Sequence, residues 1–463
     1  MELPDKRLRN VLMNLVERVK KRQTLSLRRL SSSRKEEIQF GRFLSNTRVK
    51  FESLEAMLYA QCQQDAGTSR HLLLLEDSSQ MAFSLQRNIE GLGKIDKGIL
   101  QGFYLHPVLT LDAHTAACHG ISALEFRVRS QESDGLTYQQ RKSARNKEFF
   151  EDKEAYRWRS SIETALGNLP LSASKTVVAD RESDIYAVLV GLKSDLGVDY
   201  VIRSRINRPL IDGQKLYEKV LSWPVEHEFE VDLPPTDERS AHRARLQLRY
   251  GEVVMKKSEV RTKKQVPPTW SSGVVYVREV AETVVNHQKP VSWILMTSHP
   301  IPSSADALRI VDYYKQRWNV EQLFRVLKTK CLRFESSQLT QYEKLRKLMV
   351  VALMGAVKVL QLLRARDGTT QQSLAATFEP DEQTFLTKLN SALEGNTQKQ
   401  KNPHPNHSLA FGAWIIARLA GWSGYQSQRP PGPTDFFTGL QRFYDQYQGY
   451  LISKEISKDV YIL

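Results

Sequence analysis

The sequence predicts a protein of the α/β class, with a helical domain at each end and a β-rich insertion in the middle. Three observations indicate this class. Two short apolar runs, each ending in an acidic residue, are typical of strands buried on both faces. Segments with helical periodicity follow both runs. Between residues 206 and 290, short alternating runs are separated by prolines and charged clusters, as in antiparallel strands.

Composition limits the class of protein. The 463 residues suffice for two or three domains, and 41% hydrophobic with 26% charged residues indicates a globular, soluble chain. No apolar run approaches the roughly 20 residues that span a membrane, and no export signal is recognisable. The cysteines Cys62, Cys118 and Cys331 are scattered, which indicates a reducing cytoplasm and argues against a zinc site.

The charge of the chain predicts a polyanionic partner. The net charge is +15, and residues 1–50 hold fourteen Lys or Arg against five Asp or Glu. Residues 1–65 have the periodicity of short helices carrying these basic residues. They are interpreted either as a DNA-contacting module, whose cations neutralise phosphates, or as solvated basic helices.

The order of elements after residue 65 predicts an RNase H-like core. Three strands are expected, then a helix, a strand, a helix and a strand. Their ranges are His71–Asp77, Gly98–Leu111, Ala116–Ser130, Arg141–Leu169, Lys175–Asp180, Ile185–Lys193 and Asp199–Arg205. In such sheets the active site lies at the carboxyl ends of central strands, where Asp77 and Asp180 are expected.

The remaining chain continues this arrangement. Residues 206–290 form the β-rich insertion, whose loop Met255–Pro268 is expected to be mobile or to face DNA. A strand at Val291–Met296 precedes a helix capped by Ser304 or Ser303. The predicted domains are therefore 1–65, 66–366 and 367–463. In the last helix, aromatic residues between Phe436 and Leu451 share one face, which either packs on its own domain or forms a dimer interface.

The segment from Tyr314 to Lys328 carries a strip of polar groups. On one helix, Tyr314, Arg317, Glu321 and Lys328 would fall within about 60° of each other and would face outward, opposite an apolar face. A solvated charged face is the ordinary interpretation of such a pattern. An aromatic residue and two cations around one acid also suit a metal-bound phosphate.

Three acids could form a metal site. Asp77 and Asp180 come from buried strand ends, and Glu321 comes from the later helix. Paired divalent ions need shared oxygen ligands, and Mg²⁺ prefers a few carboxylates together with water and phosphate. Arg317 and Lys328 could hold phosphate oxygens, and Tyr314 could donate a hydrogen bond to one. A single strand-end acid is more often a cap or turn residue.

The spacing Tyr314-x2-Arg317-x3-Glu321-x6-Lys328 resembles the YREK signature of bacterial cut-and-paste DDE transposases. It is similar in particular to the insertion-sequence group that includes the transposon five transposase. The motifs LEDSS around Asp77, VADRESDIY around Asp180, WILMTSHP before the strip and SLAFGAWIIARLAGW near the end also resemble this family. With the basic N-terminal helices, the resemblance covers nearly the whole chain.

The resemblance implies roles for individual residues. Asp77, Asp180 and Glu321 would bind Mg²⁺, with Mn²⁺ as a substitute, while Tyr314, Arg317 and Lys328 would contact transposon-end phosphates. Trp293 would stack on a flipped base, although an ordinary strand tryptophan is the simpler interpretation. Arg203 and Arg205 would touch end DNA.

The resemblance also implies a reaction and partners. A synaptic homodimer would nick transposon-end DNA, form and resolve a hairpin, and join the 3′-hydroxyl to target DNA. The place of action would be the cytoplasm of a bacterium, at the nucleoid.

The chain departs from the family at its start, where the basic helix at Asp5–Val19 begins earlier than its counterpart. This predicts weaker reading of transposon ends. Two alternatives therefore stay open: a non-catalytic inhibitor that dimerises with a full-length transposase, and a host DNA-binding protein or nuclease of the same fold.

Overall fold

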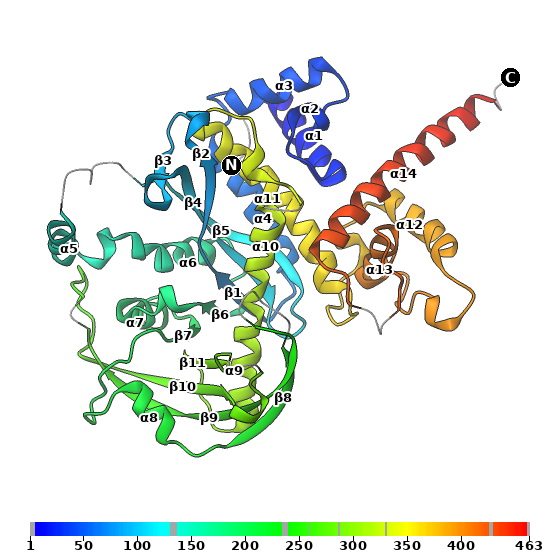
Figure 1. Cartoon of the computed structure of the whole chain (residues 1–463). Helices are drawn as coiled ribbons and strands as arrows, with labels where there is room; N and C mark the ends of the chain where they lie inside the picture. The colour runs from blue at the N-terminus through cyan, green and yellow to red at the C-terminus, as the bar shows by residue number, and fades with distance from the viewer. Residues whose placement is uncertain are drawn as a thin grey trace.

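The computed structural model describes residues 5–129, 137–233, 239–258, 260–285, 288–328, 331–425 and 429–460. Its centre is one mixed sheet of eleven strands, so the predicted α/β class is confirmed. Figure 1 shows helices α1–α3 at the top and helices α12–α14 at the right, and both groups contact the long helix α11. Ser130 and Glu259, which belong to the predicted strand 116–130 and loop 255–268, lie outside the described residues.

The N-terminal region is helical, as predicted. The helices are α1 (Lys6–Arg22), α2 (Leu27–Leu30), α3 (Arg34–Ser45) and α4 (Phe51–Asp65). Asp5 caps α1 by accepting a hydrogen bond from the amide of Arg7, and the apolar stripe of α1 is buried. Helix α4 lies against strand β5 (Cys118–Arg127) and against α11 (Tyr342–Ala365), so this region is joined to the core.

The first part of the sheet is organised around β4 (Leu100–Asp112). Strand β5 pairs with one edge of β4, from Tyr104 to Leu111. Strand β1 (His71–Glu76) pairs with residues 108–112 of β4, and β2 (Ser79–Ser84) pairs with residues 100–105, so the two strands follow one another along its other edge. Asp77 and Ser78 lie at the break between β1 and β2. The sequence did not predict β2 or the short β3 (Gly93–Ile95).

The parallel centre of the sheet contains β1, β6 (Ser174–Ala179) and β7 (Asp199–Arg203). Helix α7 (Tyr186–Ser194) connects β6 to β7. The single helix predicted over 141–169 is wrong, because α5 (Tyr138–Lys147) and α6 (Arg157–Gly167) are separated by two short 3₁₀ turns. Helix α6 therefore begins at Arg157, close to the end of β1.

The β-rich insertion extends the same sheet. It contains α8 (Leu216–Ser222), β8 (His227–Leu233), β9 (His242–Lys256) and β10 (Thr269–Glu279). Strand β11 (Ser292–Thr297) pairs with β10 on one side and with β7 on the other. The insertion is thus continuous with the core sheet, and Trp293 lies on the strand that joins them.

The strip of polar residues does not lie on one continuous helix, as the sequence predicted. Helix α9 (Ser304–Gln316) is capped by Ser303 and ends just before Arg317, and α10 (Trp318–Lys328) follows. The amide of Arg317 donates to Tyr314 O, and the amide of Val320 donates to Arg317 O, so the junction is a tight 3₁₀ turn. The outward orientation was also wrong, because Tyr314 is only 4% exposed and faces the sheet.

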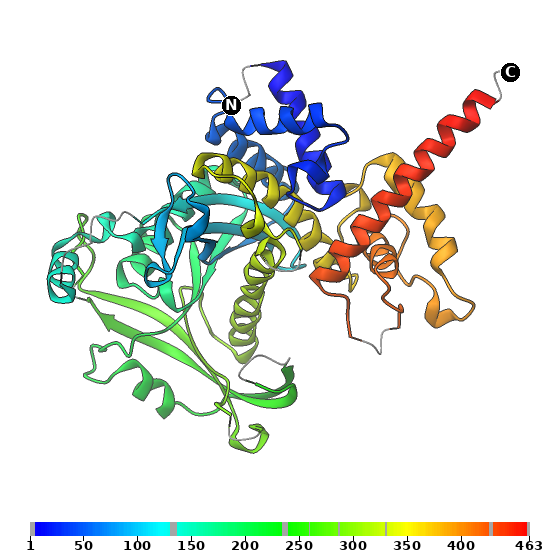
Figure 2. The same cartoon turned by 45° about the horizontal axis from the view of Figure 1, so that its top comes forward.

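The C-terminal helices pack beside α11. They are α12 (Pro380–Leu393), α13 (Leu409–Leu419) and α14 (Pro433–Val460), and Figure 2 shows the far end of α14 extending away from the others. Helix α11 is apolar and long enough to cross a membrane, but 89% of its most apolar window is buried inside the protein. It is therefore weak support for a membrane span, since a core helix has the same composition.

The aromatic stripe of α14 packs on its own domain, which was one of the two interpretations. Phe436, Leu440 and Phe443 are fully buried, and the Phe443 ring lies 5.7 Å from the Phe385 ring of α12. These side chains are therefore not available as a dimer interface. Beyond the stripe, residues 452–456 form a continuous exposed run.

A glutamate in α4, Glu55, is expected to make the stability of the folded protein depend on pH. Burial raises the pKa of Glu55 to about 7, although the hydroxyl of Tyr59 donates to its carboxylate at 3.1 Å. Its stabilising contribution is full below its ordinary pKa and is lost as the pH rises through 7. The variant Glu55→Gln is therefore expected to gain thermal stability relative to wild type between pH 5 and pH 8. Equal differences at both pH values, or the same trend in Glu52→Gln on the exposed face, would contradict this.

Candidate active site

Asp77 stands at the carboxyl end of β1, where the chain leaves the sheet. The amide of Ser78 donates to its Oδ1 at 2.8 Å. Burial raises the pKa of Asp77 to about 6. Arg317 opposes this change, while the charges of Glu321 and Asp180 add to it. The side chain of Asp77 is 25% exposed, so it remains accessible from solvent.

Asp180 occupies the corresponding position at the carboxyl end of the neighbouring parallel strand, β6. Glu76 pairs with Ala179 in the parallel ladder, so Asp77 and Asp180 are the next residues after the last paired position. The hydroxyl of Tyr314 donates to Asp180 Oδ1 at 3.1 Å, and Arg203 lies 4.0 Å from the same oxygen. The prediction that both aspartates lie at one sheet end is confirmed.

Arg317 joins the third acid to the first. Its guanidinium contacts Asp77 Oδ2 at 3.2 Å and Glu321 Oε1 at 2.5 Å. Burial opposes the charge of Arg317, but Tyr314 and Glu321 raise its pKa further above the usual value. The turn between α9 and α10 thus places one buried cation between two carboxylates that belong to distant parts of the chain.

The three acids fit a divalent cation by their chemistry. Carboxylate oxygens are the protein ligands that Mg²⁺ prefers. The place between Asp77 and Glu321 already holds a positive charge, the guanidinium of Arg317. Among the described residues, no three His, Cys, Asp or Glu side chains are grouped closely enough to hold a metal as they stand. Arg317 and Tyr314 instead occupy oxygens of all three acids, so a metal would compete with both.

The other predicted site residues lie at different distances from the acids. The Trp293 ring contacts the Tyr314 ring, with centroids 5.3 Å apart. Arg203 donates to the carbonyl of Ser292 at 3.1 Å, whereas Arg205 is exposed. In the part of the chain that the structure describes, no hydrogen bond or ion pair joins Lys328 to the acids. Burial lowers its pKa, which Glu335 partly offsets.

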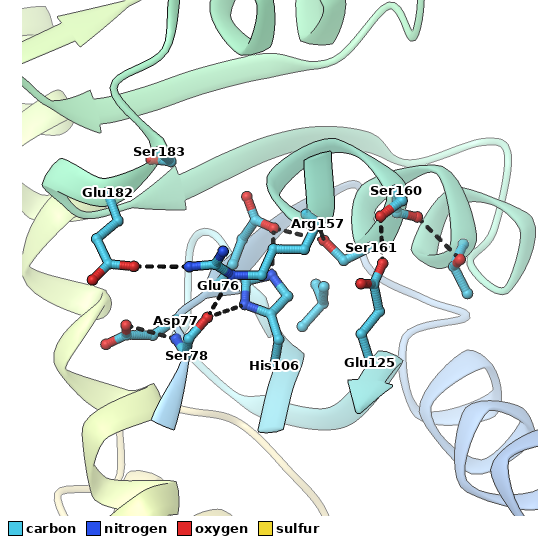
Figure 3. Close-up of polar contacts among 12 residues, drawn as sticks. Glu76, Asp77, Ser78, His106, Glu125, Arg157, Ser160, Ser161, Glu182 and Ser183 are labelled. Carbon is cyan, nitrogen blue, oxygen red and sulfur yellow. Dashed lines mark hydrogen bonds and ion pairs between the residues drawn. The ribbon is translucent and has the colours of Figure 1, made fainter. Parts of the chain in front are cut away.

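A buried polar row behind Asp77 was missed by the sequence prediction. His106 Nδ1 lies 2.8 Å from Ser78 Oγ, and His106 Nε2 lies 3.2 Å from Glu76 Oε2 (Figure 3). Burial raises the pKa of Glu76 well above its usual value and lowers that of His106 to about 3. His106 is therefore neutral at pH 7, and burial favours the uncharged form of Glu76. Glu76 follows four leucines, and this pattern alone could not tell which neighbours face it.

A comparison of the sequence with models of known protein families finds one domain that includes part of this site. Residues 159–357 match the family model described as "Transposase DDE domain". The matched segment contains Asp180, Tyr314, Arg317 and Glu321, while Asp77 lies before it. The match spans less than half of the chain, and it supports a transposase of the DDE type, which acts on DNA.

Proposed function

We propose that the protein is a DDE transposase that cleaves transposon ends and joins the 3′-hydroxyl ends to target DNA. One observation carries the proposal. Arg317 contacts both Asp77 and Glu321, and Asp180, at the end of the strand next to Asp77, accepts a hydrogen bond from Tyr314. Two of these acids lie in the segment that matches a transposase DDE domain. The strand order around β4, β1, β6 and β7 supports an RNase H-like core.

Some of these residues would bind metal ions, and others would bind the phosphates of the DNA. Two divalent ions, Mg²⁺ or Mn²⁺, held by Asp77, Asp180 and Glu321 would activate the attacking oxygen and stabilise the leaving oxygen. Arg317, once its carboxylates bind metal, would be available to hold a phosphate of the cleaved strand through its planar fork. Tyr314, whose hydroxyl now donates a hydrogen bond to Asp180, would instead donate it to the same DNA strand.

The end DNA would be held by residues around this centre. Trp293, beside Tyr314, would stack on a flipped base, and Arg203 and Arg205 would contact the DNA backbone at the exit of β7. Lys328 would bind a phosphate further along α10. These residues and the YREK spacing support the narrower assignment to the transposon five group, in which a nick is followed by a hairpin and its resolution.

A basic groove supports DNA binding at a second place. A cavity of about 470 Å³ near α3 is small, but a larger one of about 1430 Å³ lies between α1, α2, the segment after α10 and α14. The larger cavity is lined by seven cations and two acids, namely Arg18, Lys21, Arg22, Arg28, Arg29, Arg333, Arg442, Glu37 and Asp445. Such an excess suits a nucleic-acid backbone. We therefore assign it to transposon-end DNA.

The assembly follows from the reaction. Cutting two ends together requires a homodimer in a synaptic complex, acting on DNA in the cytoplasm, at the nucleoid. The non-catalytic inhibitor is less well supported, because all three acids are present and accept contacts from Arg317 or Tyr314. A domesticated nuclease of the same fold would cut DNA without joining it to a target.

The test uses DNA that flanks the source gene. Purified protein is incubated with a labelled end fragment and Mg²⁺, and the products are separated on a denaturing gel. A nick and a hairpin at the boundary of the repeat are expected, followed by joining when target DNA is added. Binding without cutting would favour the inhibitor, cutting without joining would favour the nuclease, and the absence of binding would contradict the proposal.

A further inference from the structure

The two strand-end aspartates leave the sheet without a backbone link between them. The parallel ladder of β1 and β6 ends at the pair Glu76 and Ala179. Beyond this pair, side-chain contacts must set the separation of the Asp77 turn and the Asp180 loop. That separation decides whether both carboxylates can reach one metal ion. A residue that bridges the two turns would therefore matter to the site without touching a substrate.

Arg157 makes this bridge, as Figure 3 shows. Its Nε donates to Ser78 Oγ at 2.9 Å, next to Asp77. Its second terminal nitrogen donates to Glu182 Oε2 at 2.8 Å, two residues after Asp180. Its remaining nitrogen donates to the carbonyl of Glu154 at 3.1 Å. One guanidinium thus connects both turns and is itself anchored to the 3₁₀ turn that precedes α6.

The surroundings of Arg157 keep this bridge in place. The side chain is 15% exposed, and its guanidinium lies 5.0 Å from the Trp158 ring. Ser78 is held from the other side by His106, whose partner Glu76 also accepts a hydrogen bond from Ser161 Oγ at 2.7 Å. A cation in the first turn of a helix is unfavourable for the helix itself. The position of Arg157 is therefore explained by its contacts with the turns.

We propose that Arg157 is a positioning residue that holds the Asp77 turn and the Asp180 loop in register for metal binding. The inference rests on the proposed function, because it concerns the same acids. Residues that orient metal ligands typically change metal affinity about 10- to 100-fold when they are replaced. A lysine could not replace Arg157, because a single ammonium lacks the fork that reaches Ser78 and Glu182 together.

The experiment measures Mn²⁺ binding to the full chain by titration calorimetry, without DNA. Arg157→Gln and Arg157→Lys are expected to weaken binding about tenfold or more. The matched control is Arg159→Gln, on the same helix, whose partners Glu163 and Asp195 are away from both turns. It is expected to bind Mn²⁺ as wild type does. Wild-type affinity in Arg157→Gln would overturn the inference.

A second variant covers the case in which Arg157→Gln does not fold. Glu182 is 66% exposed, so Glu182→Gln leaves the core untouched and removes only the negative charge from the outer half of the bridge. It is expected to weaken Mn²⁺ binding, and the double variant is expected to be no weaker than Arg157→Gln. Additive losses would mean that Glu182 binds metal directly, which contradicts a role through Arg157.

The failure of the inference can be told apart from the failure of the proposed function. Asp180→Asn is measured beside the other variants. If it loses Mn²⁺ binding while Arg157→Gln and Glu182→Gln do not, the metal site stands and the positioning role is wrong. If wild type binds no Mn²⁺, or Asp180→Asn binds it equally well, the metal site is wrong and the positioning role falls with it.

Discussion

Replacing Asp180 by asparagine is expected to abolish cleavage of the end fragment while binding to that fragment is retained. The substitution keeps the size of the side chain and can still accept the hydrogen bond from Tyr314, so the fold should persist. It removes one of three negative charges that a divalent cation needs. We expect a loss of at least about 10²–10³-fold in the cleavage rate, the size reported for removing one group that stabilises a transition state. Single-turnover cleavage with Mg²⁺ measures the rate.

The matched control for this variant is Asp312→Asn on α9. Asp312 is 64% exposed and pairs with Lys315 on the surface of the same helix that carries Tyr314. It is expected to cleave as wild type does, because it lies outside the group of contacts around Arg317. Equal cleavage by Asp180→Asn and wild type would show that the acids at the strand ends are structural.

Replacing Arg208 by methionine is expected to cost about 3–5 kcal/mol of stability, the usual effect of leaving a buried charge unpaired. Arg208 and Asp184 are 3% and 0% exposed and form an ion pair. The other Asp184 oxygen accepts from the amides of Arg205 and Ile206 at 2.7 and 2.9 Å. The pair thus fixes the turn that follows Arg203. Unfolding in urea, followed by fluorescence, measures the loss.

A double variant separates the ion pair from simple packing. Arg208→Met combined with Asp184→Asn removes both charges and keeps an oxygen that accepts from the amides of Arg205 and Ile206, so it is expected to recover much of the stability lost by Arg208→Met. A cost below about 1 kcal/mol for Arg208→Met, or no recovery in the double variant, would contradict a pair that depends on mutual neutralisation.

Local sequence patterns were sufficient to predict the strands that end at Asp77 and Asp180. The runs before Asp77 and Asp180 are apolar on both faces, which is typical of a strand in the middle of a sheet that is covered on both sides. Their neighbours in the sheet could be inferred from the order of elements. Strand β2 was missed because its residues, Ser79 to Ser84, alternate only weakly and follow β1 without a turn of glycine or proline.

Other features depend on contacts that periodicity does not encode. Helical spacing runs through Arg317 without interruption, so the turn between α9 and α10 could not be seen in the sequence. The aromatic stripe of α14 was correctly recognised as apolar, but its partner Phe385 lies far away along the chain. Arg157 and Ser78 are separated by 79 positions, and no local pattern relates them.

The most direct test of the account maps the metal site by protein cleavage. Fe²⁺ is substituted for Mg²⁺ in the complex with the end fragment, and peroxide then generates hydroxyl radicals at the bound ion. Backbone cuts are expected near Asp77, Asp180 and Glu321, and these cuts should be suppressed by excess Mg²⁺ and absent in Asp180→Asn. Cuts confined to other parts of the chain, or unchanged by that substitution, would contradict a metal centre built from these three acids.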